Sequence, residues 1–301
     1  MGDIEIRKLT KDYGRGRGVF DLSFTVEEGE AFGFLGPNGA GKTTALRHVM
    51  GFLTPDSGSC SVGGLDCRRD AARIQKYLGY IPGEMSLIDE MSGLEFLRFY
   101  AAYRGMDGLG RANELLEMFE LDPRARIRRM SKGMKQKVGI VAAFMHDPRV
   151  LVLDEPTSGL DPLMQNRFIE LILQEKKRGR TILISSHIFE EVERTCSRVG
   201  IIRAGRLVAI DEIDALRRSQ IRKYLIEFRD AESAKKFLEE PLDTELMSDG
   251  RVAVRVREDL NTLISALQRY PVADLETGDR SLEEIFMHYY GGGDIGDKRA
   301  L

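Results

Sequence analysis

The chain has 301 residues, of which 42% are hydrophobic and 31% are charged, and its formal net charge is −3. This profile is typical of a globular protein with room for two domains. No strong basic charge is present to hold nucleic-acid phosphates, so we expect no nucleic-acid partner. The three cysteines lack metal-ligand spacing, which favours free thiols in a reducing compartment. We find neither a signal peptide nor an apolar run of about 20 residues, and so expect no membrane-spanning segment.

The first predicted elements are strands. Period-two alternation over residues 4–13 and 20–30 predicts an antiparallel edge sheet. The run AFGFLG at residues 31–36 is dense in apolar residues, as are VLVLDEP at residues 150–156 and TILISSH at residues 181–187. Such runs are typical of strands buried on both faces of a mainly parallel sheet, and they predict an α/β core.

Helical periodicity follows between Met91 and Met145 and predicts a helical subdomain, at about residues 85–148, inserted into the α/β core. The composition changes near residue 218. Beyond it the patterns run in the order βαββαβ and end in a last helix, SLEEIFMHYY, which is typical of a small ferredoxin-like domain. We therefore predict an α/β first domain over residues 1–218, an α+β accessory domain over residues 219–290 and a flexible tail over residues 291–301.

A phosphate-binding loop is predicted at GPNGAGKTT, residues 36–44, between a strand and a helix. The segment matches GxxxxGK[ST] in the structural context that this loop requires, which leaves little room for an incidental glycine-rich turn. Its glycines let successive amides point at one anion, and the helix dipole adds to the attraction. We expect Lys42 to reach the β- and γ-phosphates of ATP and Thr43 to ligate Mg²⁺. The predicted nucleotide-binding residues here are Gly36, Pro37, Asn38, Gly39, Ala40, Gly41, Lys42, Thr43 and Thr44.

Two adjacent carboxylates, Asp154 and Glu155, end the second apolar run. Carboxylates at the end of a buried strand are costly unless cations or reacting groups meet them. We predict that Asp154 holds Mg²⁺ and that Glu155 activates the attacking water. Taken alone, the pair is also compatible with a simple helix N-cap.

Read in order, these motifs resemble the ATP-binding subunits of ABC transporters over about the first 218 residues. Tyr13 stands where that family stacks an aromatic ring on adenine, although a core tyrosine gives the same pattern. His187 ends the third apolar run at the position of the family's switch histidine, which contacts the γ-phosphate. The resemblance therefore implies a catalytic set of Lys42, Glu155 and His187, whereas His48, His146 and His288 look structural or solvated.

Two further segments resemble the parts of the family that meet a second subunit. MSKGMKQK resembles the signature motif, with Ser131, Lys132, Gly133 and Met134 facing the partner's ATP, although alone it reads as a capped basic helix. SGLD resembles the dimer-contact loop, formed by Ser158, Gly159, Leu160 and Asp161.

The sequence departs from the family pattern at a few positions. Gly83 replaces the usual glutamine of the loop after residues 79–81, and the adjacent Glu84 is an uncertain candidate for its metal contact. Lys132 stands where glycine is usual, and Met134 stands where glutamine is usual. These changes imply slower or more partner-dependent catalysis.

The resemblance implies an ATPase that works as a homodimer on a separate integral membrane permease, at the cytoplasmic face of the membrane. It need not touch the transported substrate. A groove formed by residues 83–100 and the helical insertion is expected to receive the permease, with Met85, Leu87, Ile88 and Phe96 as apolar anchors. The segment SLEEIFMHYYGG resembles the bacterial drug-resistance and antibiotic-export branch, which favours export. The alternatives are a regulatory ATP-binding module with little turnover, or a cassette acting on ribosomes or DNA.

Overall fold

The computed structural model describes residues 2–218, 222–256 and 260–278. The chain divides into two compact units, Met1–Ile213 and Asp214–Leu301, which we describe separately. The division predicted after residue 218 stays a prediction. The last helix, predicted over residues 281–290, His288 within it, and the tail predicted over residues 291–301 lie outside the described residues.

The first unit begins with an antiparallel sheet whose strand order is β2-β1-β4-β5. Burial alternates along β1 and β2, as their period-two patterns predict, so that Ile4, Ile6, Leu22 and Phe24 face inward. Helix α1 packs against this inner face, and the Phe24 ring stacks on Phe32 of the neighbouring sheet at 5.2 Å. The strands are β1 (Ile4–Asp12), β2 (Gly18–Val26), β4 (Ser57–Val62) and β5 (Leu65–Asp66).

The core sheet has the order β10-β9-β3-β8-β7-β6, in which every neighbouring pair is parallel except β9 with β10. Every residue of β3, β7 and β8 is buried, as the continuous apolar runs predict. Because the parallel strands end at the same edge, the segments that follow β3, β7 and β8 meet there. The strands are β3 (Ala31–Leu35), β6 (Leu78–Ile81), β7 (Val150–Asp154), β8 (Thr181–Ser186), β9 (Arg198–Arg203) and β10 (Arg206–Glu212).

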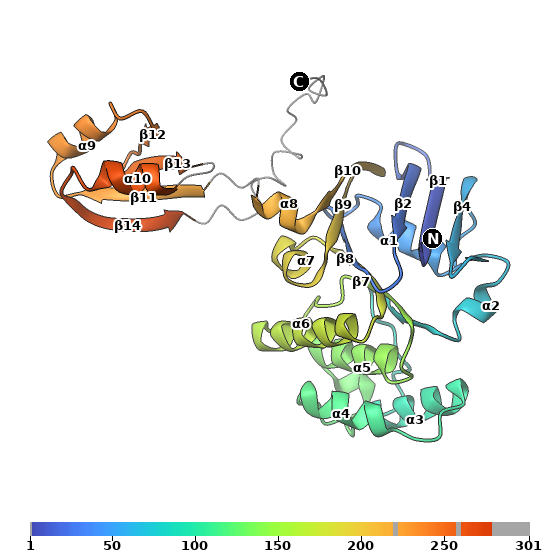
Figure 1. The fold of residues 1–301 in the computed structure, drawn as a ribbon. Helices are drawn as coiled ribbons and strands as arrows, with labels where there is room; N and C mark the ends of the chain where they lie inside the picture. The colour runs from blue at the N-terminus through green and yellow to red at the C-terminus, as the bar shows by residue number, and fades with distance from the viewer. Residues whose placement is uncertain (1, 219–221, 257–259, 279–301) are drawn as a thin grey trace. The chain divides into compact units, whose positions relative to one another are not determined.

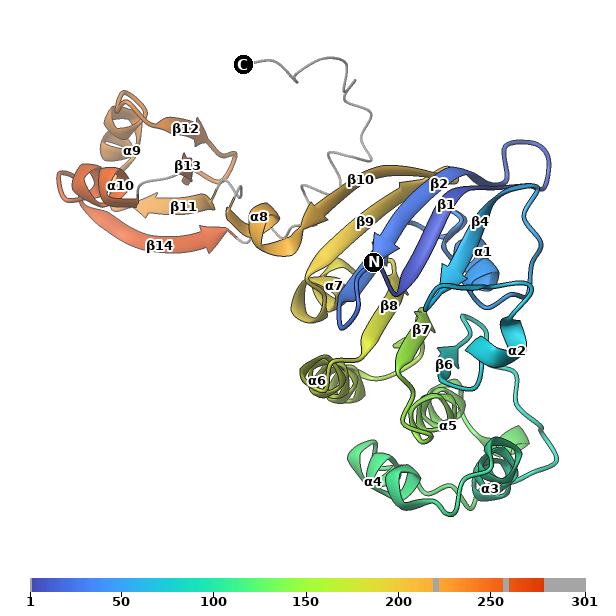
Figure 2. The same ribbon diagram turned by 45° about the vertical axis from the view of Figure 1, so that its right-hand side comes forward.

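A helical segment lies between β6 and β7, as predicted. In both views α3 and α4 lie beside α5 on the side away from the antiparallel sheet (Figure 1, Figure 2). Helix α3 begins at a capping box in which Ser92 and Glu95 each accept a hydrogen bond from the other's backbone amide. The helices of the first unit are α1 (Lys42–Val49), α2 (Ala71–Ile74), α3 (Gly93–Arg104), α4 (Gly110–Met118), η1 (Ile127–Arg129), α5 (Lys132–Phe144), α6 (Pro162–Lys177) and α7 (Phe189–Thr195); α8 (Ile213–Arg218) follows β10.

The second unit has its own antiparallel sheet, of order β12-β13-β11-β14, and its own apolar core. Tyr224, Ile226 and Phe228 alternate along β11 and pack with Phe237 of helix α9 and Leu263 of helix α10. The elements run in the order β11 (Arg222–Phe228), α9 (Ala231–Phe237), β12 (Asp243–Leu246), β13 (Val252–Val256), α10 (Leu260–Leu267) and β14 (Val272–Gly278).

Candidate active site

The loop between β3 and α1 encircles the end of the Lys42 side chain. The Lys42 ammonium donates to the carbonyl oxygens of Gly36 at 2.5 Å and Pro37 at 3.2 Å, and the side chain is only 5% exposed. Gly39 and Gly41 have φ of 81° and 108°, in the left-handed region that favours glycine. This backbone turns the start of α1 toward the loop, so amide groups and the helix dipole favour an anion there.

The Glu155 carboxylate lies between Lys42 of the phosphate-binding loop and His187, the residue that follows β8. Its Oε1 atom lies 3.0 Å from Lys42 Nζ, and its Oε2 atom lies 2.6 Å from His187 Nδ1. The Glu155 backbone has φ of 48°, and its amide donates to the Ser185 carbonyl at 3.1 Å. A non-glycine residue held in this region is strained, and such strain persists where surrounding contacts fix the conformation. The Glu155 side chain is 18% exposed, and its Oε1 atom is buried beside Lys42.

Asp154 is fully buried beside Glu155. The Ser185 hydroxyl donates to its Oδ1 atom, whereas Oδ2 has no hydrogen-bond partner among the described residues. A buried carboxylate oxygen without a donor is costly, and a cation satisfies it. Burial, and then the negative charge of Asp154, raises the pKa of Tyr80 to about 12. The donor set therefore fits a hard divalent cation.

One pocket of 280 Å³ is lined by eight of the ten predicted nucleotide-binding residues, and Gly36 and Ala40 are the two that do not line it. Tyr13, which is 48% exposed, lines the same pocket as Lys42 and Glu155. The alternative of a core tyrosine is therefore wrong, because β1 ends at Asp12 and Tyr13 starts the loop beyond it. The pocket is also lined by Arg17, Gly18, Pro37, Asn38, Gly39, Gly41, Thr43 and Thr44.

The signature and dimer-loop residues do not line this pocket. Ser131 is exposed and caps α5, accepting a hydrogen bond from the Met134 amide at 3.2 Å. Asp161 caps α6 in the same way, accepting from Met164 at 3.0 Å. Glu84 is exposed and lines a different pocket, with Gly83, Met85 and Met130. These groups are therefore placed for contacts outside the nucleotide pocket of their own chain.

The structure adds a buried residue that sequence reasoning missed. The Glu191 carboxylate accepts hydrogen bonds from Thr157, two residues after Glu155, and from Ser186, the residue before His187. Burial raises the pKa of Glu191, and the two hydroxyl donors oppose that shift. Its side chain thus links the segments that carry Glu155 and His187. The only signal in the sequence is an acidic residue on the buried face of a short helix.

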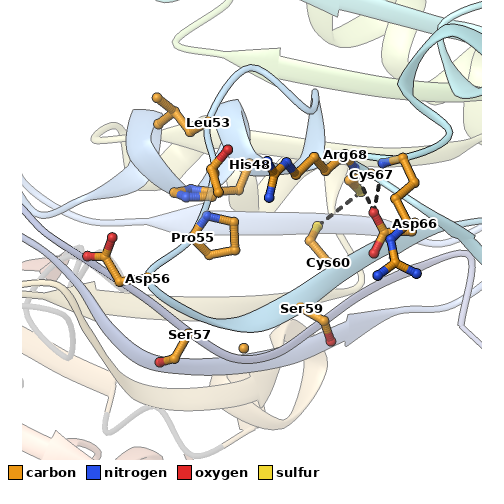
Figure 3. Close-up of a pocket in the computed structure, with 13 residues that line it drawn as sticks. His48, Leu53, Pro55, Asp56, Ser57, Ser59, Cys60, Asp66, Cys67 and Arg68 are labelled. Atoms are coloured by element: carbon orange, nitrogen blue, oxygen red, sulfur yellow. Dashed lines mark hydrogen bonds between the residues drawn. The ribbon is translucent and has the colours of Figure 1, made fainter.

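A second pocket, of 240 Å³, is lined by His48 near the end of α1 and by residues of β4, β5 and their flanking loops, and by no residue of the phosphate-binding loop (Figure 3). Its wall includes His48, whose Nδ1 atom bonds the Thr44 carbonyl at 2.7 Å. The Cys60 and Cys67 sulfur atoms approach to 3.2 Å in the same wall, and both thiols are free, as predicted. His146 is likewise structural and bonds the Leu78 carbonyl at 3.1 Å.

These features define a P-loop ATPase: a strand–loop–helix phosphate cradle after β3, with a carboxylate pair at the end of the parallel strand β7, which β8 separates from β3. The model of the ABC transporter family matches residues 19–158. The linearmycin resistance ATP-binding protein of Bacillus subtilis is 38% identical over 69% of this chain and 68% of its own. The bacitracin transport ATP-binding protein of Bacillus licheniformis is 34% identical over 97% of this chain and 99% of its own. This chain therefore belongs to the ABC transporter family, as an ATP-binding subunit with ATPase activity.

Solved structures agree with this assignment. The ATP-binding subunit of an ABC transporter is 34% identical, with a TM-score of 0.66 over 71% of this chain and 92% of that one. A dimeric ATP-binding cassette in a post-hydrolysis state, bound to ADP and phosphate, has a TM-score of 0.64 over 70% of this chain and 98% of that one. At 20% identity the second likeness supports the fold alone. Within the described residues, no helix combines the length and the apolar character needed to cross a bilayer.

Proposed function

We propose that this subunit powers export through a separate integral membrane permease, bound at the cytoplasmic face of the membrane as a homodimer. The observation that carries the proposal is the pocket in which Tyr13, Lys42 and Glu155 meet. An aromatic ring for a base, a cradle for phosphates and a carboxylate for water are the groups that ATP hydrolysis needs. The relatives' roles in linearmycin resistance, bacitracin transport and Nod factor export support the direction.

Within one protomer the residues take complementary roles. Tyr13 stacks on adenine, residues 36–44 bind the phosphates, and Lys42 neutralises their charge. Thr43 and the free oxygen of Asp154 would hold Mg²⁺, which supplies further charge neutralisation when bound. Glu155 orients and deprotonates the attacking water.

His187 shares the Glu155 carboxylate and reaches the γ-phosphate from the end of β8. Its Nδ1 atom lies 2.6 Å from Glu155, which fixes the imidazole and leaves its other nitrogen for the phosphate. Glu84 is exposed in a separate pocket, so we assign no metal contact to it.

Two protomers complete each other's sites. Ser131, Lys132, Gly133 and Met134 lie outside their own nucleotide pocket and face the ATP held by the partner, and the loop from Ser158 to Asp161 makes the dimer contact. To move a pair of protomers from 1:99 to 99:1 closed, bound ATP must favour closure by about 5.5 kcal/mol. Several charge-assisted contacts to the γ-phosphate reach that magnitude.

The substitution Ser131→Arg tests this completion in trans. We expect ATP binding to the monomer within about twofold of wild type, and phosphate release lowered at least about 10²-fold, as for a lost transition-state contact. Ser197→Arg adds the same charge at another exposed serine and should leave both quantities unchanged. Loss of ATP binding to the monomer would place Ser131 in the site of its own chain and refute the proposal.

The second unit is proposed to be a ferredoxin-like accessory domain. The element order βαββαβ and the strand order β12-β13-β11-β14, with helices packed on one face, support this. The bacitracin transport relative aligns over nearly the whole chain, which indicates that the unit belongs to the working protein.

The permease is proposed to dock between residues 83–100 and the helical insertion. A pocket of 380 Å³ opens there beside Met85 and Met130, and Ile88 is 39% exposed. Purification of the full chain from its own membranes, followed by identification of the associated proteins, tests this. A bound ribosome or DNA and no membrane protein would favour the non-transport alternative.

A further inference from the structure

The first turn of α5 is attached to the dimer loop of the same chain. Lys132 Nζ donates to Ser158 Oγ at 3.0 Å. The aliphatic stem of Lys132 covers Gly159, because a Cβ atom built on Gly159 would lie 3.0 Å from the Lys132 Cγ and Cδ atoms. The lysine therefore grips two consecutive residues of the loop, one by its charge and one by packing.

Two more contacts hold the same pair of segments together. A Cβ atom on Gly133 would lie 2.6 Å from the Gly159 carbonyl oxygen, so a side chain there would force the segments apart. The buried Gln136 amide donates to the Pro156 carbonyl at 2.7 Å. The start of α5 is thus fixed to residues 156–159 at three points, and Lys132 supplies the only charged one among these three.

Residues 156–159 continue directly from Glu155. The Glu155 backbone is strained, and its carboxylate contacts Lys42 and His187. Because the side chain has little freedom to adjust, a shift of residues 156–159 changes the position of the carboxylate relative to these two groups. A change at the start of α5 is therefore transmitted over a few residues to the group that we propose as the base.

We propose that Lys132 is a positioning residue, which couples contact of the Ser131 turn with the partner's ATP to the placement of Glu155 in its own chain. The inference rests on the proposed two-protomer ATPase function. Glycine, usual at this position in the family, has no side chain to make the bond, so the lysine adds a link. Because each protomer then reports the partner's nucleotide to its own base, the two sites hydrolyse ATP cooperatively.

The test is a double-mutant cycle on the full-length chain with Lys132→Ala, Ser158→Ala and the double variant. Phosphate release is measured against ATP concentration to give kcat, KM and the Hill coefficient, and ATP affinity is measured by equilibrium binding. Lys132→Arg tests rescue. Lys135→Ala is the matched control, because Lys135 lies in the same turn of α5 and pairs with Asp89 instead, at 3.0 Å.

We expect a wild-type Hill coefficient above 1. Both single variants should lower it toward 1 and lower kcat about threefold to tenfold, as for the loss of an exposed hydrogen bond of ordinary strength. ATP affinity should stay within about twofold, and the double variant should be no worse than the worse single variant. Lys132→Arg should retain most of the coupling, and Lys135→Ala should match wild type.

Three results would overturn the inference while leaving the ATPase function standing: a wild-type Hill coefficient of 1, additive effects of the two alanines, or a silent Ser158→Ala. A higher KM for ATP in Lys132→Ala alone would make Lys132 a direct phosphate ligand and would also overturn the inference. A wild-type chain that neither binds nor hydrolyses ATP would instead refute the proposed function, and the inference with it.

Discussion

Substitution of Glu155 by glutamine separates the two interactions of this carboxylate. The wild-type side chain pairs with Lys42 through one oxygen and with His187 through the other, at 3.0 Å and 2.6 Å. Glutamine keeps the shape, but it removes the negative charge that competes with ATP for Lys42 and the basic oxygen that accepts a proton from water. We therefore expect opposite effects on binding and on turnover.

The magnitudes follow from the geometry. Lys42 is 5% and Glu155 is 18% exposed, so we set their pairing at about 1 kcal/mol, the upper end for measured ion pairs outside the deep interior. Releasing Lys42 should tighten ATP binding roughly fivefold. Loss of a general base lowers turnover about 10²- to 10⁴-fold, or about 2.7 to 5.4 kcal/mol of activation free energy.

Three measurements check this prediction: ATP affinity by equilibrium binding, phosphate release at saturating ATP, and mass by light scattering. With ATP and Mg²⁺ the Glu155→Gln protein should accumulate as a dimer, because binding is intact and the step that reopens the pair is blocked. Glu190→Gln, at an exposed glutamate of α7, is the control and should behave as wild type. Turnover within tenfold of wild type would remove Glu155 from the role of base, and weaker ATP binding would refute the competition for Lys42.

Three further predictions concern residues around the site. Burial, and then the charge of Arg104, lowers the pKa of His146 from 6.5 to about 4, so the unfolded chain takes up a proton that the folded chain refuses. The free energy of unfolding is therefore unaffected above about pH 6.5 and falls by about 2 kcal/mol by pH 5. Denaturant titrations above about pH 6.5 and at pH 5 should show this loss in the wild type and not in His146→Gln. Gly83→Gln should lower phosphate release about tenfold, since its Cβ atom would lie 2.9 Å from Asp154 Oδ2, and a rise would contradict this. The hydrogen bond with Cys67, and then burial, raises the pKa of Cys60, and burial raises the pKa of Cys196 to about 12, so a colorimetric thiol reagent should label these thiols slowly unless guanidinium is added.

The parts of the fold that sequence predicts are those with a local cause. Strands β3 and β7 are apolar at nearly every position, and β8 is apolar from Ile182 to Ile184, because both faces of the sheet are covered. This pattern can be recognised in each strand's own sequence, without knowledge of what packs against it. Helix ends are harder to predict, because the periodicity alone places neither the end of α9 at Phe237 nor the end of α10 at Leu267. The exact ends depend on packing and capping, which the periodicity does not record.

The candidate site divides in the same way. The glycines of the loop after β3 can be predicted from the sequence, because a defined spacing is needed to wrap a phosphate. The hydrogen bonds from Thr157 and Ser186 to Glu191 cannot be predicted in this way, because they depend on how β7, β8 and α7 pack. Tyr13 was ambiguous for the opposite reason: alternation continues past Asp12, and only the end of β1 turns the ring outward.

The position of Gly83 gives the departure from the family pattern a physical reason. Its backbone lies so close to the carboxylate of Asp154 that no side chain fits without moving one of them. The loop after β6 therefore approaches the proposed metal ligand through its backbone, and the usual glutamine side chain has no room in this arrangement. The charged bond from Lys132 reaches the segment that follows Asp154 at Ser158, so under the proposed coupling the first turn of α5 governs the placement of Glu155.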